Sequence, residues 1–186
     1  WDNIVIDENA QSVYISDPQA SLDLGGIAKG YAVEQAASYL REQGLSGYAL
    51  NIGGNISIVG ARGDGSDWTV GIQSPEAEDG EPYVCRVKVK DISLVTSGDY
   101  QRYYFADGVR YHHIINPKTL MPENNFRAVT VMCRDSALGD CLSTALFNMS
   151  LEEGRELLDS LEGVQAMWVM PDGSTQMTDG FESVIA

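Results

Sequence analysis

The stretch Asp23-Leu24-Gly25-Gly26-Ile27-Ala28-Lys29-Gly30 joins a glycine pair to the start of a predicted helix. Apolar residues recur at helical spacing after it, so the helix is expected over 27–43, with Gly44 ending it. Paired glycines let the backbone approach a ligand closely, and the free N–H groups of a first helical turn attract anions. Lys29 adds a positive charge and Asp23 adds an acceptor. The stretch is therefore either a phosphate-binding loop or an ordinary helix start with a glycine hinge.

The rest of the chain predicts mostly strands joined by tight turns. Asp107-Gly108 is a strong signal for a two-residue hairpin, and Gly53-Gly54 interrupt an alternating apolar pattern. Two further helices are expected at 139–149 and 151–161. The predicted strands are 3–7, 12–16, 48–52, 56–58, 68–73, 83–90, 92–95, 103–105, 109–115, 128–133, 165–170 and 175–178. Antiparallel hairpins with a few packed helices predict an α+β fold in a single domain, 1–186.

Composition limits the ligands that this chain can bind. Its 186 residues suffice for one domain with a sizeable core, and 44% hydrophobic residues are typical of a globular protein. With 27 acidic and 12 basic residues the formal net charge is −15. Such a surface repels phosphate backbones and anionic lipid, which argues against binding to nucleic acid or membrane surfaces. An anionic ligand would need a metal ion, a lysine or a helix N-terminus beside it.

Several other classes of protein are disfavoured. Cys85, Cys133 and Cys141 are too few and too scattered for a disulfide framework, and none lies at zinc-ligand spacing from a histidine or second cysteine. No run approaches the roughly 18 apolar residues that cross a bilayer. Because the chain starts at Trp1 and not at a methionine, we expect it to be a processed or trimmed piece of a longer protein.

Two polar segments interrupt or follow predicted strands. Asn51 precedes the glycine pair 53–54, where its amide either contacts a ligand or forms the turn. Thr96-Ser97-Gly98-Asp99 follows the strand 92–95 and is expected to be a hydroxyl-rich loop, either a capped turn or a binding loop. In isolation each pattern favours the turn.

The only two histidines, His112 and His113, are adjacent in the predicted strand 109–115. Successive side chains in a strand point to opposite faces, so at most one of them can face a given site. That one could be a general base near neutral pH, and the other would orient it or lie at the surface. Either could instead be a structural histidine held by hydrogen bonds.

Asp140 and Thr144 lie four residues apart, on one face of the predicted helix 139–149. A carboxylate and a hydroxyl one turn apart can place two oxygens on one hard cation and leave room for phosphate oxygens. Magnesium favours that arrangement. The alternative is an N-terminal aspartate that stabilises the helix dipole beside an unrelated threonine, and the pair alone favours this alternative.

The order of these motifs carries more information than any one of them. They are Asp23 to Gly30, Asn51-Ile52-Gly53-Gly54, Thr96-Ser97-Gly98, His112-His113-Ile114-Ile115-Asn116-Pro117, and Asp140 with Ser143-Thr144. In this order they closely resemble the ApbE family of FAD:protein FMN transferases. The resemblance extends from about Leu22 to the Asp172-Gly173 turn. It implies an ApbE-like, T-fold-related α+β fold.

The resemblance also implies a reaction and a set of site residues. The reaction is the Mg²⁺-dependent transfer of the FMN half of FAD to a Thr or Ser hydroxyl of an acceptor flavoprotein, with release of AMP. The implied FAD-binding residues are Asp23, Gly25, Gly26, Lys29, Asn51, Gly53, Ser97, His113 and Ile114. The implied metal ligands are Asp140, Thr144 and main-chain oxygens near Gly26 and Ala137. The implied catalytic residues are Asp140 and His113, which would help to deprotonate the acceptor hydroxyl, with His112 as second choice.

The chain departs from the family pattern in a few places. Family members usually carry a further N-terminal region, with a leader, a lipid-anchor signal or both, that supplies contacts to FAD. The resemblance therefore implies an extracytoplasmic, membrane-anchored lipoprotein of which this chain is the C-terminal part. Gly139 and Cys141 stand where Ala is common, and Leu120 stands where Gly is common. We expect these small changes to preserve the metal geometry.

Two alternatives to a transferase remain open. One is a Mg²⁺-dependent FAD pyrophosphatase that yields FMN and AMP, with water in place of the acceptor hydroxyl. The other is a non-catalytic flavin-binding fragment, which would apply if the absent region is needed for catalysis.

Overall fold

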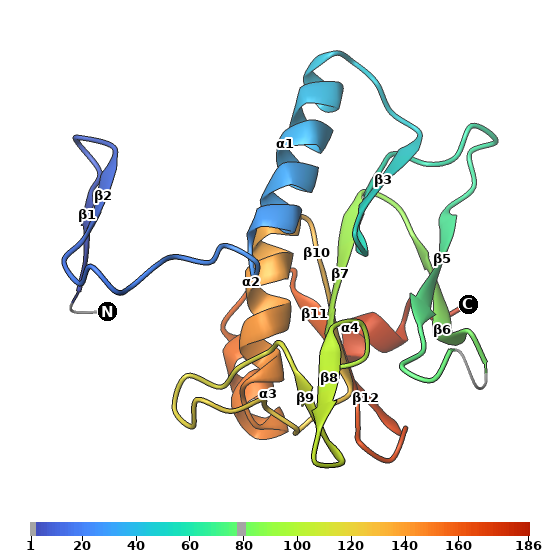
Figure 1. The fold of residues 1–186 in the computed structure, drawn as a ribbon. Coiled ribbons are helices and arrows are strands. Elements are labelled where there is room, and N and C mark those ends of the chain that lie inside the picture. The colour runs from blue at the N-terminus through green and yellow to red at the C-terminus, as the bar shows by residue number, and fades with distance from the viewer. Residues whose placement is uncertain (1–2, 78–80) are drawn as a thin grey trace.

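The computed structural model describes residues 3–77 and 81–186 and is built on a six-stranded antiparallel sheet (Figure 1). The strand order is β12-β11-β10-β7-β4-β3. These strands are β3 (Tyr48–Ile52), β4 (Asn55–Val59), β7 (Ile92–Gly98), β10 (Ala128–Cys133), β11 (Gln165–Val169) and β12 (Thr175–Met177). The described residues also form the hairpins β1 (Ile4–Asp7) with β2 (Ser12–Ile15), β5 (Trp68–Gln73) with β6 (Tyr83–Val89), and β8 (Tyr103–Ala106) with β9 (Val109–His112).

The three longer helices cover one face of the sheet, and the β5–β6 hairpin and the short helix α4 cover part of the other (Figure 1). The helices α1 (Ala28–Glu42) and α2 (Ser136–Phe147) contact each other and the sheet, α3 (Leu151–Asp159) follows them, and α4 (Asp179–Glu182) contacts β11. All residues of β10 are buried, as expected for a strand covered on both faces. The apolar run 128–133 thus places β10 at the centre of the core.

Most elements expected from the sequence are confirmed. The fold is α+β, and helix α1 ends with Gln43 as its C-cap and Gly44 at φ +73°. Asp107 and Gly108 form the β8–β9 turn at positive φ, as two-residue hairpin turns require. The glycine pair 53–54 makes the turn between β3 and β4 with φ values of +58° and +92°.

Two strand boundaries differ from the predicted ones. Thr96, Ser97 and Gly98 are not a loop, because they pair with β10 as the last residues of β7. The predicted strand 109–115 ends at His112, where the chain turns and the N–H of Ile114 donates to the His112 ring. Cross-strand pairing extended the first strand, and a local side-chain hydrogen bond ended the second.

Helix α2 starts one turn earlier than its apolar pattern predicts. The Asp135 carboxylate accepts hydrogen bonds from the N–H groups of Ala137 and Leu138, at 2.7 and 3.0 Å, and so caps the helix before Ser136. Asp140 therefore lies in the second turn, and its interpretation as an N-terminal residue for the helix dipole is wrong. The short helix α4 was not predicted, because four residues are too few to show helical periodicity.

The two long helices meet where Gly30 of α1 lies against the start of α2. The Gly30 N–H donates to Asp140 Oδ2 at 2.8 Å. A Cβ added at Gly30 would lie 2.5 Å from Asp140 Cβ and closer still to the Ser136 carbonyl oxygen. Only glycine permits this approach, which brings the loop 23–30 beside the polar face of α2.

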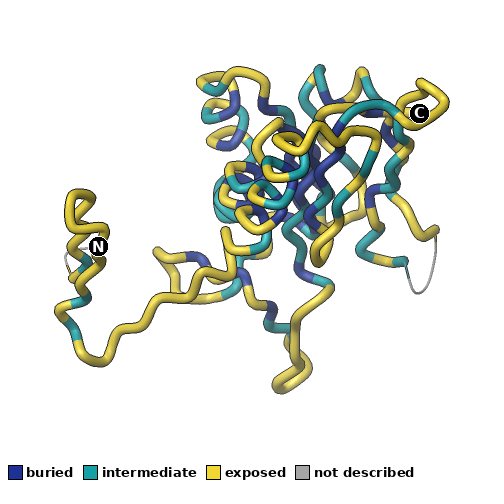
Figure 2. Tube along the Cα trace, turned by 90° about the horizontal axis from the view of Figure 1, so that it is seen from above, coloured by how far each residue is buried: buried dark blue, intermediate teal, exposed yellow. Residues whose placement is uncertain are grey.

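The β1–β2 hairpin stands apart from the rest of the molecule (Figures 1 and 2). An extended, exposed segment from Ser16 to Leu24 joins it to α1. Apolar residues on both of its strands are exposed, including Val5, Ile6, Val13 and Tyr14. The hairpin that the sequence predicted at 3–16 is thus present, and it contributes nothing to the described core.

Replacing Gly30 with Ala should destabilise the fold, because the added methyl group overlaps backbone and side-chain atoms of α2. We expect a loss of about 1–3 kcal/mol in the free energy of unfolding, measured by urea titration. Gly63→Ala is the matched control: a Cβ there meets no atom within 4 Å, so the change should stay within about 0.5 kcal/mol. Equal stability of the two variants would contradict the proposed close contact.

Candidate functional site

A cavity of about 400 Å³ lies where the loop before α1, the end of β7, the segment after β9 and one face of α2 converge. It brings together most of the site residues expected from the sequence. Of these, the cavity is lined by Asp23, Gly25, Gly26, Lys29, Gly53, Ser97, His113, Ile114, Asp140 and Thr144. Segments that are far apart in the chain therefore contribute to one space.

Asp140 is the buried charge of this cavity. The residue is 3% exposed, and its Oδ2 accepts the Gly30 N–H. Its Oδ1 lies 3.7 Å from Lys29 Nζ, whose side chain is about one-third exposed. A buried carboxylate is stable only with such partners. Asp140 thus presents one oxygen to the cavity while the other is fixed by the start of α1.

The loop 23–30 is held in shape by its own polar groups. Asp23 Oδ1 accepts the Gly25 N–H at 2.7 Å, and Lys29 Nζ donates to the Gly25 carbonyl at 3.4 Å. The N-cap residue Ile27 makes no side-chain hydrogen bond, but the first turn of α1 is partly satisfied, because the Gly30 N–H donates to Asp140 and the Ala28 N–H donates to the Leu24 carbonyl. Lys29 is therefore the main positive group at this end of the helix. Gly53 lies beside it, where a Cβ would stand 3.2 Å from Lys29 Cδ. The positive end of α1 and the lysine therefore face the same space.

Hydroxyl groups form the opposite wall. Ser97 Oγ lies 2.8 Å from Ser143 Oγ and 3.2 Å from Thr144 Oγ1, which links the end of β7 to the face of α2. A Cβ on Gly26 would lie 3.7 Å from Thr144 Oγ1, so the glycine loop runs directly over that hydroxyl. Thr144 and Asp140 project from the same face of α2, as their spacing predicts.

The donor set fits magnesium better than a transition metal. Among the described residues no group of three or more His, Cys, Asp or Glu side chains could hold a metal ion. The cavity instead offers one carboxylate, Asp140, with the Thr144 hydroxyl and the nearby Gly26 backbone. Magnesium binds through one or two carboxylates and completes its shell with water and substrate phosphates. Asp140, Thr144 and Gly26 are thus the residues that would hold it.

The two adjacent histidines have different surroundings. His112 is buried: its Nε2 donates to the Glu123 carbonyl at 2.7 Å, because its Nδ1 accepts the Ile114 N–H at 3.3 Å. Its ring also packs edge-on against Phe147, with 5.7 Å between centroids. Both of its nitrogens are therefore occupied within the protein.

His113 faces the cavity, and its surroundings favour the neutral form of its ring. Partial burial lowers the pKa of the imidazole from its ordinary value of 6.5, and the positive charge of Arg102 lowers it further. Smaller lowering effects come from His112 and Lys29. Neutral imidazole can accept a proton, so the structure favours His113 over His112 as a base.

Two of the expected site residues lie outside this cavity. Asn51 accepts the Gly54 N–H at 3.1 Å, which supports its interpretation as a turn-forming residue, and it lines an adjoining cavity of about 390 Å³. Ala137 lies in the first turn of α2 and does not line the site cavity. Its role as a metal ligand stays a prediction.

Sequence reasoning missed Arg102 and Gln101, which also line the cavity. They lie between β7 and β8, outside every motif. The sequence carries no signal for Arg102, which lies ten residues before His112, and only the fold places it close to His113.

Comparison with known proteins shows similarity along most of the chain. The model of the ApbE family matches residues 1–168. A FAD:protein FMN transferase of Klebsiella pneumoniae is 37% identical over 89% of this chain and 51% of its own length. One from Treponema pallidum is 34% identical over 91% of this chain and 49% of its own length.

Solved structures show the same similarity. The ApbE protein of Thermotoga maritima superposes with a TM-score of 0.88 at 31% identity, over 100% of this chain and 60% of that one. The flavin transferase ApbE of Vibrio cholerae gives 0.83 at 30% identity, over 98% and 58%. The chain spans about half the length of the curated relatives it matches. By sequence and by structure, the chain belongs to the ApbE family.

Proposed function

We propose that this chain carries the reaction centre of an enzyme that transfers FMN from FAD to a Thr or Ser hydroxyl of an acceptor flavoprotein. One observation carries the proposal: a single cavity joins an oxygen pair suited to magnesium, the lysine-bearing start of a helix, and a histidine with a lowered pKa. The relatives named FAD:protein FMN transferase support the same reaction.

The diphosphate of FAD would lie between the loop 23–30 and α2. Lys29 and the first turn of α1 would bind its negative charge, which an acidic protein of net charge −15 must neutralise locally. Magnesium, held by Asp140 and Thr144, would supply further charge neutralisation on the phosphate oxygens. Each such electrostatic contact contributes on the order of 3 kcal/mol to transition-state stabilisation.

His113 would accept the proton of the acceptor hydroxyl. The hydroxyl oxygen attacks the FMN phosphorus, the bond from that phosphorus to the bridging oxygen breaks, and AMP leaves with that oxygen. The hydroxyl proton passes to the neutral His113 ring, whose position is fixed because the adjacent His112 is anchored to Glu123. A well-placed base contributes roughly a hundred- to ten-thousand-fold to the rate.

The proposal includes the location implied by the family resemblance, an extracytoplasmic protein with a lipid anchor. None of the described helices is long and apolar enough to cross a membrane.

The direct test is to incubate the chain with FAD, Mg²⁺ and a flavoprotein domain that has a Thr or Ser flavinylation site. We expect flavin fluorescence that stays with the acceptor on a denaturing gel, together with equimolar AMP. If the same amount of free FMN forms with and without the acceptor, the result would support the pyrophosphatase alternative. Flavin binding without either product would support the non-catalytic one.

The pH dependence of transfer tests the role of His113. Because its pKa is lowered, kcat/KM should rise with pH through a midpoint below 6.5 and then level off. Arg102→Gln should move that midpoint upward part of the way, since burial remains the larger cause. His113→Asn should remove the acid limb and lower the rate roughly a hundredfold or more.

Arg62→Gln is the control for this profile, because Arg62 lies over Trp68 and outside the site cavity. Its midpoint should match that of the unaltered chain. Two results would rule out His113 as the base: a midpoint of the acid limb at or above pH 6.5, or a midpoint that Arg102→Gln does not change.

A further inference from the structure

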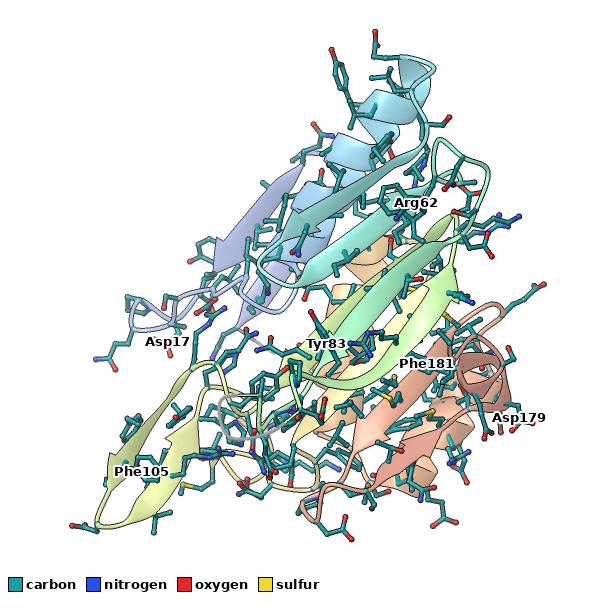
Figure 3. The ribbon with its side chains drawn as sticks, turned by 90° about the vertical axis from the view of Figure 1, so that its right-hand side faces the viewer. Asp17, Arg62, Tyr83, Phe105, Asp179 and Phe181 are labelled. Atoms are coloured by element: carbon teal, nitrogen blue, oxygen red, sulfur yellow. The ribbon has the colours of Figure 1, made fainter. Side chains whose placement is uncertain are left out.

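The β8–β9 hairpin and the loop 115–122 expose a group of large apolar side chains beside the site. We call this group the hairpin surface. Its members are Tyr103, Tyr104, Phe105, Val109, Ile115, Leu120 and Met121. Figure 3 shows Phe105 near the end of the projecting hairpin, away from the body of the molecule. Five of them, Tyr103, Tyr104, Ile115, Leu120 and Met121, line one cavity, and exposed apolar side chains gathered in this way mark interaction sites.

The hairpin surface is continuous with the proposed reaction centre. A cavity of about 600 Å³ runs along it, lined in part by Tyr104, Tyr111 and Leu120. This cavity shares Arg102, His113 and Ile115 with the site cavity. A chain segment that lies along the surface would therefore end at the His113 ring.

Charge selects the kind of segment that fits. Of the described residues that line this second cavity, Arg102 is the one with a permanent charge. It forms no ion pair with any described residue. In a protein of net charge −15, this is a local positive point that an acidic side chain of a partner can contact.

Leu120 supports a binding role for the surface. Its φ is +58°, a left-handed conformation that costs a non-glycine residue roughly 1 kcal/mol, and the residue is 76% exposed. A glycine would adopt this turn without strain. The leucine side chain is not buried within the described chain, so it is available for contact with a partner.

The base of the hairpin is held firmly. Asp99, which is 4% exposed, pairs with Arg110 of β9 and with Arg127. Tyr104 and Tyr111 stack across the two strands with centroids 5.5 Å apart. A surface fixed in this way loses little conformational freedom on binding.

We propose that the hairpin surface docks the acceptor protein, as an extended segment with apolar side chains and an acidic residue near its Thr or Ser. This inference rests on the proposed transfer reaction. It assigns the surface to the acceptor and leaves the flavin to the site cavity.

The test measures binding of two short fluorescein-labelled peptides by fluorescence anisotropy, to the chain loaded with Mg²⁺ and FAD. One peptide has a Thr flanked by Asp and apolar residues, and its match has Lys in place of Asp. We expect tighter binding of the acidic peptide. The double variant Tyr104→Ser, Leu120→Gly should weaken that binding on the order of tenfold.

Tyr39→Ser is the matched control, because Tyr39 on α1 is 61% exposed and Tyr104 is 63% exposed. It should leave peptide binding unchanged. Tyr104→Ser removes the stack on Tyr111 and Leu120→Gly relieves the left-handed strain, so the free energy of unfolding is measured alongside to show that the double variant is folded. Its FAD affinity should stay within about twofold.

Three outcomes would overturn the inference. The peptides could bind equally to the double variant and to the unaltered chain. FAD affinity could fall with the double variant, which would assign the surface to the flavin. Sedimentation could show dimers that the double variant abolishes, which would assign it to a second copy. Failure of the proposed reaction is distinct: the unaltered chain would then bind the acidic peptide but form no covalent FMN on an acceptor.

Discussion

The structure depends on one contact, in which the N–H of Gly30 meets the carboxylate of Asp140 at 2.8 Å across 110 residues of sequence. Glycine permits it, because any side chain at position 30 would overlap the start of α2. The carboxylate requires it, because a buried charge without a hydrogen-bond donor is costly. The same contact therefore joins the two helices and orients the proposed metal ligand.

The remaining parts of the site are positioned by the sheet. Pairing of β7 with β10 carries Ser97 to the end of its strand, where it meets Ser143 and Thr144 of α2. The buried His112 fixes the chain after β9, so that the next residue turns toward the cavity. Strand pairing and helix packing thus position Ser97, Thr144 and His113, and no described residue of the β1–β2 hairpin lines the cavity.

The sequence predicted the fold well where the pattern is local. Three features could be predicted because each depends only on neighbours in the chain. They are the helix α1 from its apolar spacing, the glycine turn at 53–54 and the Asp107-Gly108 turn. The prediction from sequence was wrong where pairing with a distant strand determines the structure. Thr96 to Gly98 have the composition of a loop, but they form a strand because they pair with β10. Asp135 was not recognised as a cap, so Asp140 was assigned to the wrong turn of its helix.

For the candidate site, the motifs identified most of the residues that meet, but not the reason that they meet. Spacing placed Asp140 and Thr144 on one face, whereas their distance from Gly26 and Ser97 follows from helix packing and strand pairing. Arg102 carries no motif at all, yet it lies between the site and the hairpin surface and lowers the pKa of His113. The spacing of residues in the sequence does not reveal a residue that acts on the pKa of another through its charge.

The most direct test of the proposed metal and diphosphate site is a crystal structure of the chain with FAD and Mn²⁺, in which anomalous scattering locates the metal. We expect one strong peak at coordination distance, about 2.0–2.3 Å, from Asp140 and Thr144 oxygens, with the diphosphate between it and Lys29. A metal peak elsewhere, or a diphosphate bound away from the loop 23–30, would contradict the proposed site.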